Sequence, residues 1–357
     1  HSTRDVKLDL PNVYQDGNEY FLNVYAYTRK ATTMLPEHYE VAREQFKLGD
    51  GNFFLTKEKE VGELSVERNG NILSFKSGSI SGRFDLKKGV FYDYTLDGQL
   101  PIVQYPEPAF WRAPVDNDFG NKMPLQCGVW RTAHVNRSLQ NVVVGEKDDN
   151  GILVRMEWML NDIQVPYTVE YQICNDGSVV VTGSMDMTGR KLPELPRFGM
   201  RMELKNGYEN LVYYGRGPQE NYIDRCSSTF VGRYEDKVRN QYYEYIRPQE
   251  TGNKTDVRWL TLCNDNGVGI QITGLQPIAF SALHFAPEDL DPGLTRKMQH
   301  SIDVIPRKNI FLHVDLKQRG LGGDNSWGMY PHSEYRLLDK KYSYSYRMKL
   351  VELKKAD

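Results

Sequence analysis

The chain has 357 residues, which is more than one typical domain and enough for a large β domain of up to about 250 residues with a smaller piece beside it. Its net charge is −2 with 26% charged residues, a balance that offers no basic surface to nucleic acid and no acidic tail typical of disorder. No apolar run reaches the roughly 18 residues of a membrane-spanning helix. We therefore expect neither nucleic acid nor a membrane as a partner.

Cysteine and histidine give no sign of a metal centre or of a disulfide framework. The four cysteines are far apart and form no C-x-x-C pair, and the seven histidines show no H-x-x-x-H or other ligand spacing. The G-x-S-x-G motif of serine hydrolases is missing too. We predict no metal site and no cofactor site in this chain.

The first fifty residues predict two or three β-strands. Asp16-Gly17 is a tight-turn signal, and residues 20–27 follow with β-forming side chains throughout. The end of the stretch 34–48 alternates charged or polar residues with small or apolar neighbours. So few strands cannot bury a core unaided. We interpret this segment as the last part of a β-sandwich whose earlier strands lie outside the sequence.

A second pattern begins after the Gly-rich linker at 49–52. Short β-rich runs, for example 64–67, 80–86 and 179–185, carry the alternating or continuous apolar pattern of buried strands, and only 286–290 predicts a brief helical turn. The runs are separated by dipeptides that favour the positive φ angles of hairpin turns, namely Asn69-Gly70, Asp97-Gly98, Asn150-Gly151, Asp176-Gly177, Asn206-Gly207 and Asn266-Gly267. This pattern predicts an all-β chain with a large antiparallel β domain.

The densest polar cluster lies at 110–121. In extended backbone, Asp116 and Asp118 would point to the same face, where they could approach a cation or sugar hydroxyls. A glycosidase acid and nucleophile is disfavoured here, because such pairs usually come from distant strand ends. We favour the alternative, a network in which Arg112 pairs with aspartate and Asx turns pin a loop.

Two further polar clusters lie at 213–225 and 247–253. The G-x-G at 215–217 is not a phosphate loop, because a proline follows at once and no helical pattern opens after it. The third cluster resembles the second in chemistry, and we expect both to be mainly structural. We expect the charged residues of the second cluster to pair among themselves; they are Arg216, Glu220, Asp224 and Arg225.

A glycine-rich loop at 320–327 ends in the largest aromatic residue, Trp327. An indole can stack on the apolar face of a sugar ring while Asp324 and Asn325 hydrogen-bond to its hydroxyls. The alternative is that the tryptophan is a buried anchor of its own loop. Spacing alone leaves both interpretations open.

Four sequence blocks occur in a characteristic order: R-A-P-V-D-N-D at 112–118, G-R-G-P-Q-E-N-Y-x-D-R at 215–225, P-Q-E-x-G-N at 248–253 and G-G-D-N-S-W at 322–327. Together they resemble the C-terminal region of family 2 glycoside hydrolases, in particular large bacterial β-galactosidases. The short block L-P-R-F-G at 195–199 adds to the resemblance, which runs from about residue 60 to the end. The opening segment resembles the end of the immunoglobulin-like sandwich that precedes this region.

The resemblance implies an all-β architecture. Residues 53–357 would be the terminal β-supersandwich, a large antiparallel fold like that of galactose mutarotase, and 1–52 the C-terminal part of an immunoglobulin-like β-sandwich. The family's catalytic (β/α)₈ barrel, with two glutamates and its magnesium and sodium sites, would lie outside this chain. The chain would then be inactive alone and would need that barrel and the upstream sandwich as partners.

The same resemblance implies a terminal β-D-galactoside as substrate and a homo-oligomeric parent enzyme in the cytoplasm or periplasm of a bacterium. Trp327 resembles a tryptophan that forms a platform for the sugar, with Asp324 and Asn325 beside it, and Gly120 resembles a hinge glycine. The implied active-site loop comprises Asp116, Asn117, Asp118, Phe119, Gly120 and Asn121. The implied structural residues are Arg112, Arg216, Glu220, Asn221, Asp224 and Arg225.

Two other functions are compatible with the sequence. A stand-alone carbohydrate-binding module would bind galactose or lactose by itself. A mutarotase or aldose epimerase would need a histidine and a carboxylate that converge on one face of the sheet, and His284 and His300 are available, without a motif that places either.

Overall fold

The structure is a computed structural model that describes residues 3–10, 16–55, 61–295, 299–325 and 327–353. By its internal contacts the chain divides into two compact units, His1–Glu58 and Lys59–Asp357, which are described separately below. The predicted domain limits, 1–52 and 53–357, and the sandwich origin of the first part remain predictions.

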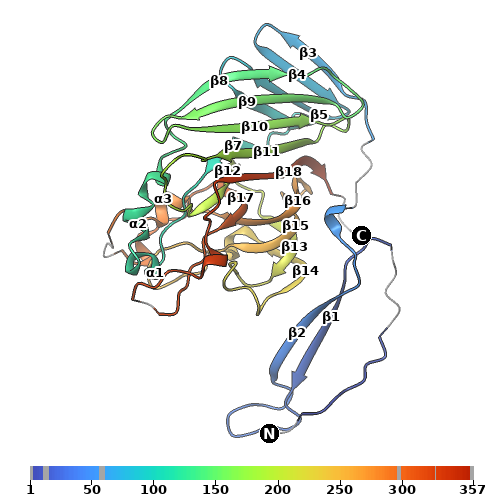
Figure 1. Ribbon diagram of the computed structural model, residues 1–357. Coiled ribbons are helices and arrows are strands. Elements are labelled where there is room, and N and C mark those ends of the chain that lie inside the picture. Colours follow the sequence, from blue (N-terminus) through green and yellow to red (C-terminus); the bar gives the residue numbers. More distant parts are fainter. Residues whose placement is uncertain (1–2, 11–15, 56–60, 296–298, 326, 354–357) are drawn as a thin grey trace. The chain divides into compact units, whose positions relative to one another are not determined.

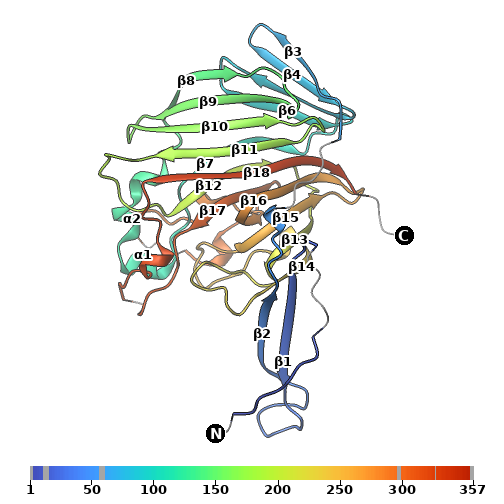
Figure 2. The ribbon, with the colours of Figure 1, turned by 45° about the vertical axis from the view of Figure 1, so that its right-hand side comes forward.

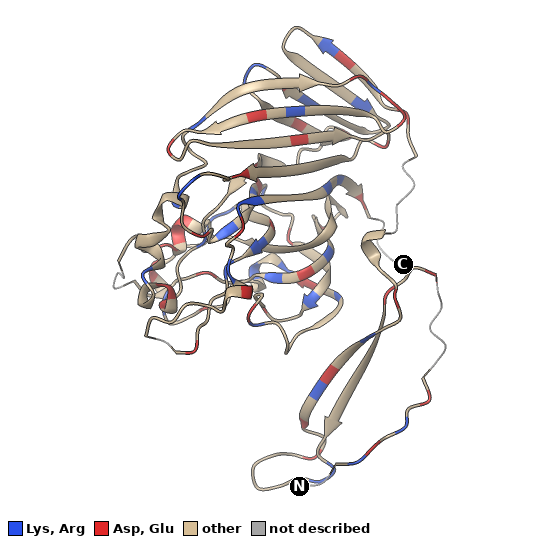
Figure 3. Ribbon diagram, in the orientation of Figure 1, with Lys and Arg blue, Asp and Glu red and all other residues tan. Residues whose placement is uncertain are grey.

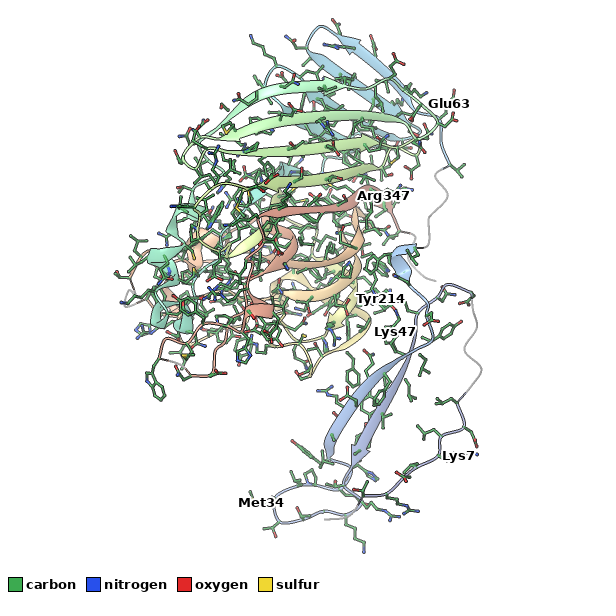
Figure 4. The ribbon with its side chains drawn as sticks, viewed as in Figure 1. Lys7, Met34, Lys47, Glu63, Tyr214 and Arg347 are labelled. Atoms are coloured by element: carbon green, nitrogen blue, oxygen red, sulfur yellow. The ribbon has the colours of Figure 1, made fainter. Side chains whose placement is uncertain are left out.

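The first unit is built on one antiparallel hairpin (Figure 1). β1 (Tyr20–Tyr27) pairs with β2 (Glu40–Leu48), and one turn of 3-10 helix, η1 (Phe53–Leu55), follows. None of the described residues of this unit is buried, and Met34, in the loop between the two strands (Figure 4), is 87% exposed. The strand predicted at 20–27 is confirmed. As expected for two strands, the hairpin encloses no core of its own.

The second unit begins with a four-stranded antiparallel sheet in the order β3-β4-β5-β6. Its strands are β3 (Ser65–Asn69), β4 (Ile72–Ser77), β5 (Ile80–Asp85) and β6 (Val90–Leu96). Burial alternates along β4 and β5, because successive side chains of a strand point to opposite faces. One face of this small sheet therefore belongs to the core.

The other sheet of this unit has twelve strands among the described residues, all paired antiparallel. Nine follow the order β14-β13-β15-β16-β18-β11-β10-β9-β8, while β12 pairs with β7 and β17, and β17 pairs with β16. The strands are β7 (Ile102–Ala109), β8 (Arg137–Val144), β9 (Ile152–Leu160), β10 (Val165–Ile173), β11 (Val179–Asp186), β12 (Arg197–Leu204), β13 (Asn210–Gly217), β14 (Phe230–Lys237), β15 (Lys254–Cys263), β16 (Val268–Leu283), β17 (Ile310–Gln318) and β18 (Lys341–Glu352).

Helices are short in the described residues. The α-helices are α1 (Asp116–Gly120), α2 (Met123–Gln126) and α3 (Pro287–Leu290), and the 3-10 helices of this unit are η2 (Gly128–Arg131), η3 (Val238–Asn240), η4 (Ser301–Asp303) and η5 (Ser333–Tyr335). The helical turn predicted at 286–290 is confirmed by α3. None of the helices in the described part of the chain has the length and apolar character that crossing a membrane would require.

β18 occupies an inner position of the large sheet, between β11 and β16 (Figures 1 and 2). In both views it runs across the molecule beside strands that are far away in sequence. The last strand is therefore part of the centre of the sheet and not an addition to its edge.

Aromatic side chains join the two sheets of this unit. Phe84 of β5 is fully buried, with its ring stacked on Phe91 of β6 at 4.5 Å between centroids. The Phe84 ring also meets Tyr171 of β10 edge-on at 5.2 Å, so the small sheet packs against the large one through this cluster. Buried aromatic pairs of this kind contribute area and a preferred geometry.

The all-β prediction is confirmed, since antiparallel strands form both sheets and helices are confined to single turns. Each of the six glycines predicted to form turns has a positive φ, from 59° at Gly70 to 108° at Gly151. Acidic and basic residues are interspersed over both units (Figure 3), in keeping with the small net charge.

Candidate functional site

The cluster at 110–121 is helical where the sequence suggested extended backbone. Asp116–Gly120 form α1, which leaves Asp116 exposed and Asp118 fully buried, so the less favoured interpretation, with both carboxylates on one face of an extended segment, is wrong. The reason is local: Asp118 accepts a hydrogen bond from the Val115 backbone N–H at 2.8 Å and thereby caps the first helical turn. The favoured alternative, an Arg–Asp network, is confirmed.

That network joins five charged residues, four of which have buried side chains while Arg336 is partly exposed at its edge. Asp118 Oδ2 lies 2.5 Å from Arg112 Nη1, and Asp118 Oδ1 lies 2.7 Å from Arg319 Nη1. Glu194 continues it, 3.2 Å from Arg319 Nε and 2.8 Å from Arg336 Nε. Burial alone would lower the pKa of Arg112, but the neighbouring Asp118 carboxylate raises it above its usual value. Buried charges of this kind are tolerated only when they are paired.

Residues 320–330 form the loop that carries Trp327, called the tryptophan loop below. Its first limb, Gly320–Gly322, is fixed by three side chains. Arg112 Nη2 donates to the Gly320 carbonyl at 3.4 Å, and Asn117 Nδ2 donates to the Leu321 carbonyl at 3.2 Å. Asp224 accepts from the Gly322 backbone N–H at 2.7 Å. A side chain at 320 would bring its Cβ to 2.8 Å from the Asp224 carboxylate, so glycine is required for this approach.

The second limb, Gly328–Tyr330, returns over α1. A Cβ at Gly328, where φ is 143°, would come within 3.0 Å of the Gly120 carbonyl, and Asn121 Nδ2 donates to the Met329 carbonyl at 3.5 Å. The Tyr330 ring lies beneath the Arg336 guanidinium at 4.8 Å. The hydroxyl of Tyr330 donates to Gln126 of α2 at 2.7 Å.

Between the two limbs, the loop carries Trp327 into solvent. The side chain is 87% exposed, so the buried-anchor interpretation is wrong. Asn325 Oδ1 accepts from the Trp327 backbone N–H at 2.9 Å, and Asp324 Oδ1 lies 2.8 Å from His332 Nε2. Ser326 lies outside the described residues. The exposed indole is thus borne on a short turn whose base is fixed.

The pairing expected within the second cluster is only partly correct. Arg225 does pair with Glu220 at 2.6 Å, but Arg216 lies 3.5 Å from Asp256, and Asp224 holds Gly322 as described above. The strand β13 and the turn after it direct these side chains to different neighbours. The spacing of charged residues along one segment does not show which neighbours these are.

The second and third clusters are joined to each other. Glu220 Oε2 accepts from the Gly252 backbone N–H at 2.7 Å. Asn253 Nδ2 donates to the Asn221 carbonyl at 2.8 Å, and the Asn221 backbone N–H donates to the Asn253 carbonyl at 2.8 Å. These bonds hold the segment after β13 against the segment before β15.

Several residues of the site were not predicted. Arg319, Glu194, Arg336 and Tyr330 stabilise the tryptophan loop, yet none belongs to a local polar motif. Arg197 of the L-P-R-F-G block pairs with Glu250 at 3.0 Å, which joins this block to the third cluster. The remaining residues have partners far away in sequence, so no local pattern identifies them.

The four sequence blocks meet around an open hollow of ≈ 330 Å³. Its lining residues are Val115, Asp116, Asn117, Asp224, Arg225, Tyr245, Gln249, Glu250, Leu321 and Gly322. The first limb of the tryptophan loop forms part of this lining. The resemblance had indicated these segments as a group, and the structure brings them together.

Histidine contributes little to this region. His284 is held by Glu209 at 2.7 Å and by the Asn309 carbonyl, His300 is exposed, and neither lines the hollow. In the described part of the chain no group of three or more His, Cys, Asp or Glu side chains could hold a metal ion. No observation here favours the epimerase alternative.

The ion pair between His332 and Asp324 gives a pH-dependent prediction. The hydrogen bond to Asp324, with its charge and that of Glu334, raises the pKa of His332 above the usual 6.5. The contribution of this pair is therefore complete below pH 6.5 and is lost as pH rises through the folded-state pKa. Histidine ring resonances followed by NMR should give a pKa for His332 above the usual 6.5, and Asp324→Asn should lower that pKa. An unchanged value in Asp324→Asn would contradict this assignment.

Two family descriptions match the chain. The family described as β-galactosidase small chain matches residues 76–348, and the family described as β-galactosidase domain 4 matches residues 1–49. Since the first match covers most of the chain, the chain belongs to the β-galactosidase small-chain family. It corresponds to a C-terminal region of bacterial β-galactosidases.

Individual relatives carry the same name. The chain is 31% identical over 350 residues to a β-galactosidase of Priestia megaterium, covering 97% of this chain and 33% of the relative. It is 29% identical over 329 residues to a β-galactosidase of Halalkalibacterium halodurans, covering 90% of this chain and 32% of the relative. The chain thus spans about a third of the length of these curated relatives.

Solved structures show distant likenesses. A family 36 α-galactosidase from Geobacillus stearothermophilus aligns with a TM-score of 0.43 at 8% identity, covering 81% of this chain and 41% of that one. A galactose 1-epimerase from Lactobacillus acidophilus aligns with a TM-score of 0.41 at 11% identity, covering 82% of this chain and 99% of that one.

Proposed function

We propose that this chain is the part of a retaining β-galactosidase that supplies one wall of the pocket for a terminal β-D-galactoside. In this proposal Trp327 stacks on the sugar ring, and the two catalytic glutamates lie in a barrel domain elsewhere in the enzyme. The observation that carries it is the 87% exposure of Trp327 at the tip of a loop whose two limbs are both fixed.

The physical argument starts from solvation. An indole left in water forgoes most of the burial that normally stabilises a tryptophan, whereas a sugar ring offers an apolar face of matching size. Because the loop is already fixed at its base, little conformational freedom is lost when a ligand covers the indole. A preformed, exposed aromatic surface is what a binding wall requires.

Asp324 and Asn325 flank the indole and supply polar groups to a sugar. The Asp324 carboxylate, 67% exposed in its side chain, can accept from a sugar hydroxyl while its contact with His332 fixes its direction. Asn325 supports the turn through its Oδ1, which leaves its amide N–H groups to face the ligand. These groups bind and orient, while proton transfer and nucleophilic attack are assigned to the barrel.

The proposal predicts the effect of Trp327→Ala in the intact β-galactosidase that contains this chain. Loss of the stacking surface should raise KM for lactose or a nitrophenyl galactoside by about 30-fold, corresponding to about 2 kcal/mol at a binding hot spot. Trp327→Tyr should retain part of the affinity, since a smaller aromatic face remains. Steady-state kinetics measure both.

The matched control is Val143→Ala, which shortens an apolar side chain that is 44% exposed on β8, away from the lining of the hollow. It should leave KM unchanged. A KM in Trp327→Ala equal to that of the unaltered enzyme would remove the basis of the proposal.

A stand-alone carbohydrate-binding module is the second candidate, because the same exposed Trp327 could bind a sugar without a barrel. Titration of the isolated chain with galactose and lactose separates the two. Millimolar or tighter binding that disappears in Trp327→Ala supports the module. If the isolated chain does not bind these sugars and only the intact enzyme does, the result supports the proposal that the chain forms one wall of the galactoside pocket.

We also infer that the His1–Glu58 unit completes a sandwich with strands from elsewhere in the enzyme. Its β2 strand exposes Val41 and Phe46 by 54% and 50%, more apolar surface than a lone hairpin can keep stable in water. The match of residues 1–49 to β-galactosidase domain 4 supports the same inference.

A further inference from the structure

The tryptophan loop has a narrow neck, which we define as Gly320–Gly323 on one side and Gly328–Tyr330 on the other. The two sides approach closely, because a Cβ at Gly323 would lie 2.6 Å from the Met329 carbonyl. The space between the two limbs at this point would not admit a side chain at 323. The position of the tip therefore depends on what fixes the neck from outside.

Asp224 is the most direct of these contacts. Its Oδ2 accepts from the Gly322 backbone N–H at 2.7 Å, and its carboxylate lies where a side chain at Gly320 would collide. A carboxylate that accepts from an amide makes a short, charge-assisted hydrogen bond. Asp224 thus touches the first limb at two positions, two residues apart.

The position of Asp224 is itself set by a tight turn. The Arg225 backbone N–H donates to the Tyr222 carbonyl at 2.8 Å, and the Tyr222 N–H donates back to the Arg225 carbonyl at 3.2 Å. Tyr222 is 1% exposed, with the Arg225 guanidinium over its ring at 5.2 Å. Since the turn is closed by two backbone bonds and one buried ring, Asp224 has a fixed base.

Asn117 is the second contact, and it comes from a different element. It lies on α1, whose next residue, Asp118, is held in the buried arginine centre, and its Nδ2 donates to the Leu321 carbonyl. Asn117, Asp224, Leu321 and Gly322 all line the hollow. The first limb is therefore held between α1 and the turn at 222–225.

We propose that Asp224 is a positioning residue that sets the place of Trp327 in the sugar site, with Asn117 as the second support. Asp224 does not touch the sugar; it fixes the Gly320–Gly322 limb from which the indole projects. This inference rests on the proposed role of Trp327 as a wall of the galactoside pocket. It assigns a role within the sugar site to Asp224, which the sequence had indicated only as a structural residue.

A double-mutant cycle in the intact β-galactosidase tests the proposal, with KM and kcat measured for a nitrophenyl galactoside. Asp224→Ala should raise KM about 10-fold and change kcat by less than about 3-fold, whereas Asp224→Asn, which keeps an oxygen acceptor for Gly322, should stay within about 2-fold of the unaltered enzyme. In a Trp327→Ala background, Asp224→Ala should change KM by less than about 2-fold, because the group that it positions is already gone.

The matched control is Asp265→Ala, which removes a carboxylate whose side chain is 90% exposed on the turn between β15 and β16. Its kinetics should equal those of the unaltered enzyme. Thermal unfolding of each variant reports whether the fold is kept. Where Asp224→Ala does not fold, Asn117→Ala enters the same cycle and should give the same non-additive pattern.

Three results would count against the inference. If the fold-change in KM of the double variant equals the product of the two single fold-changes, the inference is overturned, because Asp224 would then affect KM independently of Trp327. An unchanged KM in folded Asp224→Ala overturns it as well, and if Trp327→Ala raises KM in the same experiment, the proposed function stands. An unchanged KM in Trp327→Ala overturns both.

Discussion

Asp118→Ala is expected to lower the free energy of unfolding of the second unit by about 3–5 kcal/mol, because it leaves two arginines buried without their shared carboxylate. Arg112, Asp118 and Arg319 are all 0% exposed, and the carboxylate lies within 2.7 Å of a guanidinium nitrogen on both sides. The alanine also removes the cap on the Val115 N–H. Urea unfolding followed by circular dichroism measures the change.

The neighbouring Asp116 provides the control for this prediction. It lies two residues away on the same helix but is exposed, so Asp116→Ala should change the free energy of unfolding by no more than about 0.5 kcal/mol. Asp118→Asn separates shape from charge, since it keeps the side-chain volume and loses the negative charge. Equal losses for the alanine variants at 116 and 118 would contradict the role given to the buried centre.

Phe84→Ala is expected to lower the free energy of unfolding by about 3–5 kcal/mol, because removing a buried ring between the two sheets leaves a cavity. Phe84 is 0% exposed and meets Phe91 at 4.5 Å and Tyr171 at 5.2 Å between ring centroids. A cavity there would loosen β5 from β10 and leave each sheet with an exposed apolar face. Denaturant unfolding again reports the loss.

Two variants make the Phe84 result interpretable. Phe84→Leu retains most of the volume and should cost less than half as much as alanine, while Val90→Ala, at a position 43% exposed on β6, should have little effect. A loss in Phe84→Ala no greater than in Val90→Ala would mean that the two sheets do not depend on this contact.

The turns could be predicted because their cause is local. A hairpin turn needs a positive φ, glycine adopts it without steric cost, and all six glycines expected in turns have such a φ. Strands were recognised for a similar reason, since period-two burial appears directly in the sequence of β5 and β11. Local rules therefore gave the class of the fold.

The site was harder to predict, because its contacts join distant segments. Asp118 and Arg319 are 201 residues apart, and nothing in either segment indicates that they share a buried ion pair. The arrangement of Asp116 and Asp118 on one face was considered only for extended backbone, and the helical turn α1, capped by Asp118 itself, replaces that backbone. Asp224 was expected to pair with charges nearby and instead holds a backbone N–H 98 residues away.

The order of the four blocks along the chain indicated which segments form the site, and the chemistry of each segment alone did not. Their resemblance to one enzyme region indicated that residues near 116, 224, 250 and 322 belong together, and the structure places all four around one hollow. The spacing of residues in the sequence could not decide whether Trp327 is exposed or buried. Solvent exposure depends on how the neck is held, and this required the glycines and their neighbours to be placed in space.

The inner position of β18 has a consequence during synthesis. Until residues 341–352 leave the ribosome, the facing edges of β11 and of the 16-residue β16 have no partner in the nascent chain. Unpaired edges of buried strands are templates for association with other chains. Expression of versions that lack residues 341–352 should therefore give more aggregated protein than expression of versions that keep β18.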